Sequence, residues 1–163
     1  MKDIILKAEG VQKTFANNGS QIHVLSDVNL EIYKGDFTVI MGSSGSGKLT
    51  LLYALSGMDG ATSGRVLYYP HKDSKEAVGE NIDVVKVKES QLSKLRINDF
   101  GFVFQQMHLI SNLSLFENVA VTGYLNKKVS AADTNKRTAE LLERMGLSEI
   151  SDHLPSQVSG GEQ

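Results

Sequence analysis

A glycine-rich segment in the first third of the chain has the residue types and spacing of a phosphate-binding loop. It follows the pattern Gly-x-x-x-x-Gly-Lys, and its residues are Gly42, Ser43, Ser44, Gly45, Ser46, Gly47, Lys48, Leu49 and Thr50. Glycines allow backbone N–H groups to turn inward around a phosphate, and a following helix adds its positive N-terminus. Lys48 would reach the β and γ phosphates of a nucleotide as a point charge. The segment predicts a nucleotide-binding P-loop (residues 42–48), and the alternative is a flexible Gly/Ser linker.

One position departs from the P-loop pattern. The residue after the lysine is normally Ser or Thr, whose hydroxyl binds Mg²⁺, but this chain has Leu49. Mg²⁺ takes oxygen ligands, although water can replace a missing one. Thr50 lies about 100° further around a helix, so it is a poor substitute. We therefore expect impaired handling of Mg·ATP.

The elements before the loop are predicted by hydrophobic periodicity. Residues 4–11 are rich in β-branched side chains and predict a strand, and residues 16–20 (ANNGS) predict a turn. Apolar and polar residues alternate over 28–32, which is typical of a half-buried strand. The run FTVIM at 37–41 predicts a strand buried on both faces, as in a parallel sheet.

The sequence after the loop predicts both helices and strands. Leu51, Ala54, Leu55 and Met58 have helical spacing, so we expect an amphipathic helix that ends near residues 57–60. Further along, the patterns predict a strand at 65–69, a surface loop at 70–82, a short helix at 91–96, an apolar strand at 100–104 (FGFVF), and a helix from Ser130 to about Met145 with Gly146 as its C-terminal cap.

Composition narrows the class of protein. The 163 residues include 17 Lys and Arg, 19 Asp and Glu, and no cysteine, for a net charge of −2. Without a basic excess we expect no nucleic-acid partner, and without cysteine neither disulfides nor thiolate metal sites are possible. No stretch approaches 18 apolar residues, and the apolar run at the start of the chain is too short for a signal peptide. We expect a cytoplasmic protein, or one peripheral to a membrane through a partner.

Two more segments separate a transporter ATPase from a P-loop kinase or GTPase. The last residues, 158–163 (VSGGEQ), follow Pro155-Ser156-Gln157 and resemble the signature segment of ABC ATPases. Residues 102–105 (FVFQ) resemble the entry to their Q-loop. The stretch FVFQQMHLI…LSLFENV is similar to the branch that serves lipoprotein release, macrolide export and antimicrobial-peptide export or resistance. The resemblance covers essentially the whole chain.

This resemblance implies roles for individual residues. Phe15 matches the aromatic residue that stacks on adenine, or else it only packs the hairpin. Gln105 matches the glutamine that senses Mg²⁺ and the γ-phosphate and couples to the membrane partner, or else it is an ordinary polar residue at a strand end. Ser159, Gly160 and Gly161 match the segment that binds ATP held by a second subunit, or else they form a flexible tail. A Ser-Gly-Gly turn that opens a helix offers N–H donors and a positive dipole to phosphate.

The resemblance also implies an architecture and partners. We expect an α/β fold of the P-loop NTPase type, with an N-terminal antiparallel β portion and P-loop core over residues 1–108 and a helical subdomain over 109–163. The ligands would be ATP and Mg²⁺, and the partners a membrane permease and a second ATPase subunit. The protein would then sit on the inner face of the cell membrane through the permease, which selects the transported substrate.

The family's Walker B aspartate, catalytic glutamate and switch histidine have no counterpart in residues 1–163, because the core strands that carry them would follow Gln163. We therefore expect an energy-coupling ATPase subunit, represented in part, that does not hydrolyse ATP by itself. The alternative is a truncated, non-hydrolytic fragment that binds nucleotide or permease.

Overall fold

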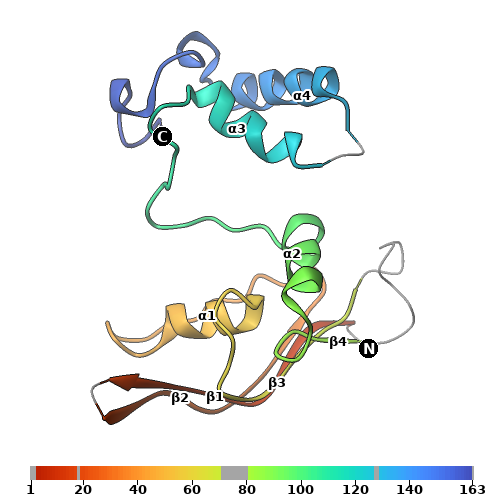
Figure 1. The fold of residues 1–163 in the computed structure, drawn as a ribbon, viewed down its shortest axis with the longest axis vertical. Coiled ribbons are helices and arrows are strands. Elements are labelled where there is room, and N and C mark those ends of the chain that lie inside the picture. Colours follow the sequence, from red (N-terminus) through yellow and green to blue (C-terminus); the bar gives the residue numbers. More distant parts are fainter. Residues whose placement is uncertain (1–2, 18, 71–80, 127–128, 163) are drawn as a thin grey trace. The chain divides into compact units, whose positions relative to one another are not determined.

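The computed structural model describes residues 3–17, 19–70, 81–126 and 129–162, with only the backbone of Asn17 (Figure 1). Packing of the backbone divides the chain into two compact units. Unit 1 is Met1–Phe102 and unit 2 is Val103–Gln163. The expected boundary was between residues 108 and 109.

Unit 1 is built on an antiparallel sheet whose strand order is β2-β1-β3-β4. The long hairpin of β1 and β2 pairs from Ile4 opposite Tyr33 to Asn17 opposite Ser20, so both strands extend well beyond the predicted ranges. The expected antiparallel β portion is confirmed. The strands are β1 Ile4–Asn17, β2 Ser20–Tyr33, β3 Ser63–Tyr68 and β4 Ile82–Asp83. Most of the predicted loop at 70–82 lies outside the described residues, and Ile82 belongs to β4.

Helices α1 (Lys48–Ser56) and α2 (Glu89–Asn98) cover one face of this sheet (Figure 1). Helix α1 ends at Gly57, which has the left-handed φ of 67° and donates its N–H to the last carbonyls of the helix. Met58 therefore lies beyond the helix that was predicted to include it. The buried core joins both helices to the sheet, and its members are Leu6, Ala8, Val11, Leu25, Ala54, Leu55, Val66, Tyr68, Val84, Leu92 and Leu95.

The predicted strand at 37–41 is wrong, because these residues form no strand in the structure. Ile40 packs against the core of unit 1, but Phe37 is 94% exposed and Met41 85% exposed. A strand buried on both faces needs a neighbouring strand along its edge. The described residues supply no such neighbour, since the sheet consists of β1 to β4 alone.

The predicted strand at 100–104 is also wrong, since none of these residues has strand hydrogen bonding. Phe100 instead ends α2 by donating its N–H to the Leu95 carbonyl oxygen at 3.2 Å, and its ring lies 5.1 Å from that of Tyr68. Burial, together with the neighbouring Asp99, raises the pKa of Tyr68 to about 12. Packing after a helix, rather than a sheet, therefore accounts for Phe100, whereas Phe102, Val103 and Phe104 are exposed.

Unit 2 is helical, as expected for this part of the chain. Its described elements are α3 Leu115–Tyr124, α4 Ala131–Arg144 and the short 3-10 turns η1 Ser148–Ile150 and η2 Pro155–Gln157. The predicted helix from Ser130 is confirmed: the Asp133 N–H donates to the Ser130 hydroxyl at 3.0 Å, and Gly146 has the left-handed φ of 74° just past the C-terminal end.

Sequence reasoning missed helix α3, although its start carries a clear signal. The Glu117 N–H donates to the Ser114 hydroxyl at 3.1 Å, while the Ser114 N–H donates to the Glu117 carboxylate at 2.8 Å. This reciprocal pair is a capping box, and its Ser-x-x-Glu spacing is readable in the sequence. Where α3 packs on α4, a Cβ at Gly123 would lie 2.5 Å from Cγ2 of Thr134, so only glycine allows this close approach.

Candidate functional site

The P-loop of unit 1 has the backbone of a phosphate-binding turn. Gly45 (φ 78°) and Gly47 (φ 85°) lie in the left-handed region, where other residues are strained. Gly47 is also the N-cap of α1, and no side chain caps that end. The first N–H groups of α1 have no intrahelical partner, so they remain available as donors at the positive end of the helix.

Close contacts also require glycine in this loop. A Cβ at Gly47 would lie 3.0 Å from the Val24 carbonyl oxygen and 3.3 Å from Cδ2 of Leu25. A Cβ at Gly42 would lie 2.6 Å from the Ser46 hydroxyl oxygen. The loop is therefore pressed against β2 at one end and folded on itself at the other, which excludes the flexible linker interpretation.

Lys48 points back across the loop that precedes it. Its Nζ donates to the carbonyl oxygens of Gly42 at 2.9 Å and Ser43 at 2.6 Å, and it lies 3.5 Å from the Ser46 hydroxyl. None of these three groups is negatively charged, and the first turn of α1 contains no acidic residue. The positive charge of Lys48 is thus not neutralised by these contacts, so it is suited to an anionic ligand.

A hollow of about 410 Å³ lies between the P-loop and β2. Its border combines polar groups of the loop with apolar side chains. Its lining consists of Val24, Leu25, Ser26, Val28, Ile40, Met41, Gly42, Ser43, Ser46, Gly47, Lys48 and Leu51. The P-loop, the Lys48 ammonium and the uncapped start of α1 together fit a polyphosphate.

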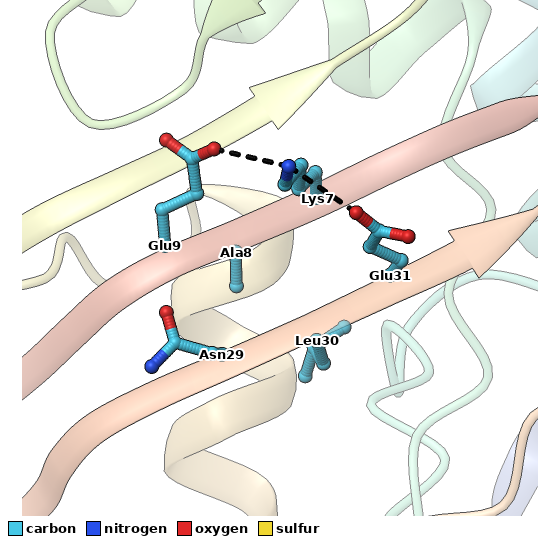
Figure 2. Close-up of a pocket in the computed structure, with 6 residues that line it drawn as sticks. All are labelled: Lys7, Ala8, Glu9, Asn29, Leu30 and Glu31. Atoms are coloured by element: carbon cyan, nitrogen blue, oxygen red, sulfur yellow. Dashed lines mark ion pairs between the residues drawn. The ribbon is translucent and has the colours of Figure 1, made fainter.

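A second hollow of about 470 Å³ lies on the hairpin formed by β1 and β2, but its charges do not suit an anion. Figure 2 shows Lys7 between Glu9 and Glu31, with 3.2 Å from its Nζ to each carboxylate. These carboxylates raise the pKa of Lys7, and Lys7 lowers that of Glu9 in return. Arg65 also pairs with Glu9 at 2.6 Å, so the two carboxylates are balanced by two cations and leave no unpaired positive charge for an anion. Charge, not volume, therefore identifies the P-loop hollow as the candidate site.

The structure gives Mg²⁺ no protein ligand after Lys48. Leu49 is 59% exposed at the start of α1 and has no side-chain oxygen. Among the residues described, no three His, Cys, Asp or Glu side chains gather as a metal site would require. The donor set at this position therefore does not fit Mg²⁺, which needs oxygen ligands.

Phe15 lies near the C-terminal end of β1, opposite Ile22, and the residue is 40% exposed. The Nζ of Lys13 lies 4.9 Å from the centroid of that ring. Phe15 is thus in the same unit as the P-loop and has exposed aromatic surface. A role in stacking on a base stays a prediction.

Gln105 lies in unit 2, in an exposed segment without helix or strand.

Sequence reasoning missed Asn118, the residue that holds the backbone in this part of the chain. The Asn118 side chain accepts from the Ile110 N–H at 2.8 Å and donates to the carbonyl oxygens of Ile110, Leu113 and Ser114 at 2.9–3.1 Å. Its position one residue after the capping-box glutamate is the only sequence signal that could have indicated it.

The signature segment (residues 158–163) closes on itself through Glu162. The carboxylate accepts from both the Ser159 N–H at 2.8 Å and the Ser159 hydroxyl at 2.6 Å, while the Glu162 N–H donates to the Ser159 carbonyl oxygen. These bonds, led by the one from the hydroxyl, lower the pKa of Glu162. Both Ser159 donors expected to meet a phosphate therefore already hold an anionic oxygen. Gly160 and Gly161 are exposed beside them.

Comparison with known proteins decides the family. Residues 25–163 match the sequence profile of the ABC transporter family. This chain belongs to the ABC transporter family. It is 38% identical over 159 residues to the macrolide export ATP-binding/permease protein MacB of Campylobacter fetus, covering 98% of this chain and 23% of MacB. It is 36% identical over 159 residues to the lipoprotein-releasing system ATP-binding protein LolD of Wigglesworthia glossinidia brevipalpis, covering 98% of this chain and 64% of LolD.

Solved structures of ABC cassettes confirm the fold class. The dimeric, post-hydrolysis structure of the ATP-binding cassette MJ0796 bound to ADP and Pi is similar with a TM-score of 0.82 at 35% identity, covering 97% of this chain and 65% of that one. The predicted branch is confirmed by the LolD and MacB relatives. The chain spans less than two thirds of the length of these ABC relatives. Within the part that the structure describes, no helix is both long and apolar enough to cross a membrane.

The Ser159–Glu162 contact has a testable dependence on pH. Because the bonds favour the ionised carboxylate, they are complete above the ordinary pKa of Glu and are lost as the pH falls through the lowered pKa. We expect the Ser159 amide resonance to titrate by NMR with a midpoint below the ordinary glutamate value, and Glu162→Gln to abolish that titration. Glu149→Gln is the control and should change nothing. A midpoint at or above the ordinary value would contradict the contact.

Proposed function

We propose that this chain is the ATP-binding part of an ABC transporter subunit, and that residues 42–48 bind the phosphates of ATP. The observation that carries the proposal is the Lys48 ammonium, which is held by uncharged oxygens beside the uncapped N-terminus of α1. The family match and the ADP and Pi bound to a relative support ATP as the ligand. In the whole protein, ATP binding and hydrolysis would drive a membrane permease.

The residues of the candidate site supply binding and orientation. Polyphosphate oxygens would replace the carbonyl oxygens of Gly42 and Ser43 as partners of Lys48, and the first N–H groups of α1 would donate to them. Phe15 would stack on the base, while Ser159, Gly160 and Gly161 would contact ATP bound by a second subunit. Release of the Ser159 donors from Glu162 would precede that contact. Gln105 would sense the γ-phosphate.

The partners follow from the names of the relatives. MacB is called an ATP-binding/permease protein and LolD belongs to a lipoprotein-releasing system, so a permease for export or extraction is the proposed partner of this chain. That permease would place the protein at the inner face of the cell membrane. The segment around Gln105 supports this, since Val103, Met107 and Ile110 are exposed there and Asn118 holds the backbone at Ile110.

Nucleotide binding tests the central proposal. We expect Lys48→Ala to weaken ATP binding by about ten- to a hundredfold, because a charge-assisted hydrogen bond contributes roughly 1.5–3 kcal/mol. Isothermal titration calorimetry measures this change, with Lys94→Ala, at an exposed position of α2, as the control. We assign no carboxylate among the described residues to the orientation of water, so we expect turnover by this chain alone to equal that of Lys48→Ala. Unchanged affinity in Lys48→Ala would overturn the proposed site.

Leu49 predicts an unusual response to Mg²⁺. We expect ATP affinity to be nearly the same with Mg²⁺ and with EDTA, whereas Leu49→Ser should gain roughly threefold or more with Mg²⁺ through its hydroxyl. Leu52→Ser is the matched control, since Leu52 is exposed on the same helix. A strong increase in ATP affinity with Mg²⁺ in the unchanged chain would show that water supplies the missing ligand and would contradict this prediction.

Association with membranes tests the proposed permease surface. A variant in which both Val103 and Met107 are replaced by Asp should sediment with native membranes to a smaller fraction than the unchanged chain, because apolar contact area is lost. Met145→Asp is the control, since Met145 is also an exposed apolar residue of unit 2. Sedimentation that is equal in all three proteins would count against docking at this segment.

A further inference from the structure

A buried lysine lies behind the aromatic ring of Phe15. Lys13 is only 9% exposed, and its Nζ lies 2.6 Å from Oδ1 of Asp59 and 2.6 Å from the Gly60 carbonyl oxygen. The same ammonium lies 4.9 Å from the Phe15 ring centroid, within the range of a cation–π contact. Removing an ammonium from water is costly unless its donors are satisfied, so this arrangement needs all three partners.

The Lys13 contacts join the strand of Phe15 to the end of the P-loop helix. Asp59 and Gly60 follow the C-cap of α1, and the segment then runs along β1, where the Thr62 N–H donates to the Gln12 carbonyl oxygen at 2.8 Å. Thr62 also accepts from the Thr14 N–H through its hydroxyl. The helix that begins at the P-loop is thus attached, just past its far end, to the residues on either side of Lys13.

The N-terminal end of the same helix approaches the hairpin at the strand pair that contains Lys13. Lys13 pairs with Leu25 in the β1–β2 ladder, and a Cβ at Gly47 would lie 3.3 Å from Cδ2 of Leu25. Lys13, Phe15 and the N-cap of α1 therefore belong to one packed arrangement within unit 1. Displacing the ring would break its contact with the Lys13 ammonium, which Asp59 and Gly60 hold in place.

We propose that Lys13 is a positioning residue, which holds the Phe15 ring in place so that its exposed face can stack on the base of a bound nucleotide. This inference rests on the proposed function. A cation against one face of an aromatic ring fixes the ring and draws electron density from it, which favours stacking of an electron-rich purine on the other face. Asp59 acts one step further away by anchoring the ammonium.

The experiment compares a ligand that has a base with one that has none. We would titrate ATP and inorganic tripolyphosphate into the unchanged chain, Lys13→Met, Lys13→Arg and Phe15→Ala, and record thermal unfolding of each. Lys7→Met is the matched control, because Lys7 is an ion-paired lysine on the same strand that contacts only carboxylates.

We expect Lys13→Met to weaken ATP binding by about two- to fivefold, the effect of losing one cation–π contact, and to leave tripolyphosphate affinity unchanged. Lys13→Arg should retain most of the ATP affinity, since a guanidinium also packs on aromatic faces. In the Phe15→Ala background, Lys13→Met should weaken ATP binding no further, because both changes remove the same contact.

Equal losses for both ligands, unchanged ATP affinity, or additive losses in the double variant would each overturn the positioning role and leave Lys13 a structural ion pair. If Lys13→Met does not fold, Asp59→Asn provides the same comparison with the lysine retained, and it should weaken ATP alone. An unchanged chain that binds neither ligand would refute the proposed function itself. An unchanged chain that binds both, with no selective loss in the variants, refutes only the inference.

Discussion

The close packing of Gly47 against β2 is the constraint on which the candidate site depends. Two separate requirements meet at this residue: a left-handed φ of 85°, and space too small for a Cβ beside Val24 and Leu25. Because only glycine meets both requirements, Gly47 determines where α1 begins. The start of the helix in turn directs Lys48 back over the loop and leaves the first N–H groups of the helix as donors. Any larger residue at position 47 would move the helix and disrupt these features together.

Three lysines of unit 1 show how partners decide what a charge can do. Lys7 is bound by two carboxylates on the exposed hairpin, so its charge is already paired and its hollow does not suit an anion. Lys13 is buried with one carboxylate, one carbonyl oxygen and an aromatic ring, so its charge serves to hold those groups together. Lys48 contacts only uncharged oxygens, so it retains a charge for an anionic ligand.

Unit 2 links the segment that contains Gln105 to the signature segment through the start of α3. The N–H groups of Leu115 and Phe116 donate to the carbonyl oxygens of His153 and Ser151, just before the signature segment. Asn118, one turn into the same helix, holds the backbone at Ile110, on the side of Gln105. The start of α3 therefore anchors both segments of the unit, and a displacement of α3 would move both of them.

The sequence by itself determined the features that depend on local chemistry. The P-loop, the α1 helix and the cap at Ser130 could be predicted, because positive φ, helical spacing and capping depend on residues close together in the chain. The antiparallel β portion and the family were predicted from the resemblance carried by the three motifs. Local spacing would also have indicated α3, had the Ser114 and Glu117 pair been considered.

Only the tertiary structure decided which apolar runs become strands and which polar residues meet. Residues 37–41 and 100–104 have strand-like composition, but a strand exists only where another backbone hydrogen-bonds to it, and neither run has such a neighbour among the described residues. The contacts of Lys13 with Asp59 and of Asn118 with Ile110 were likewise unreadable, because they depend on how distant segments pack rather than on local spacing.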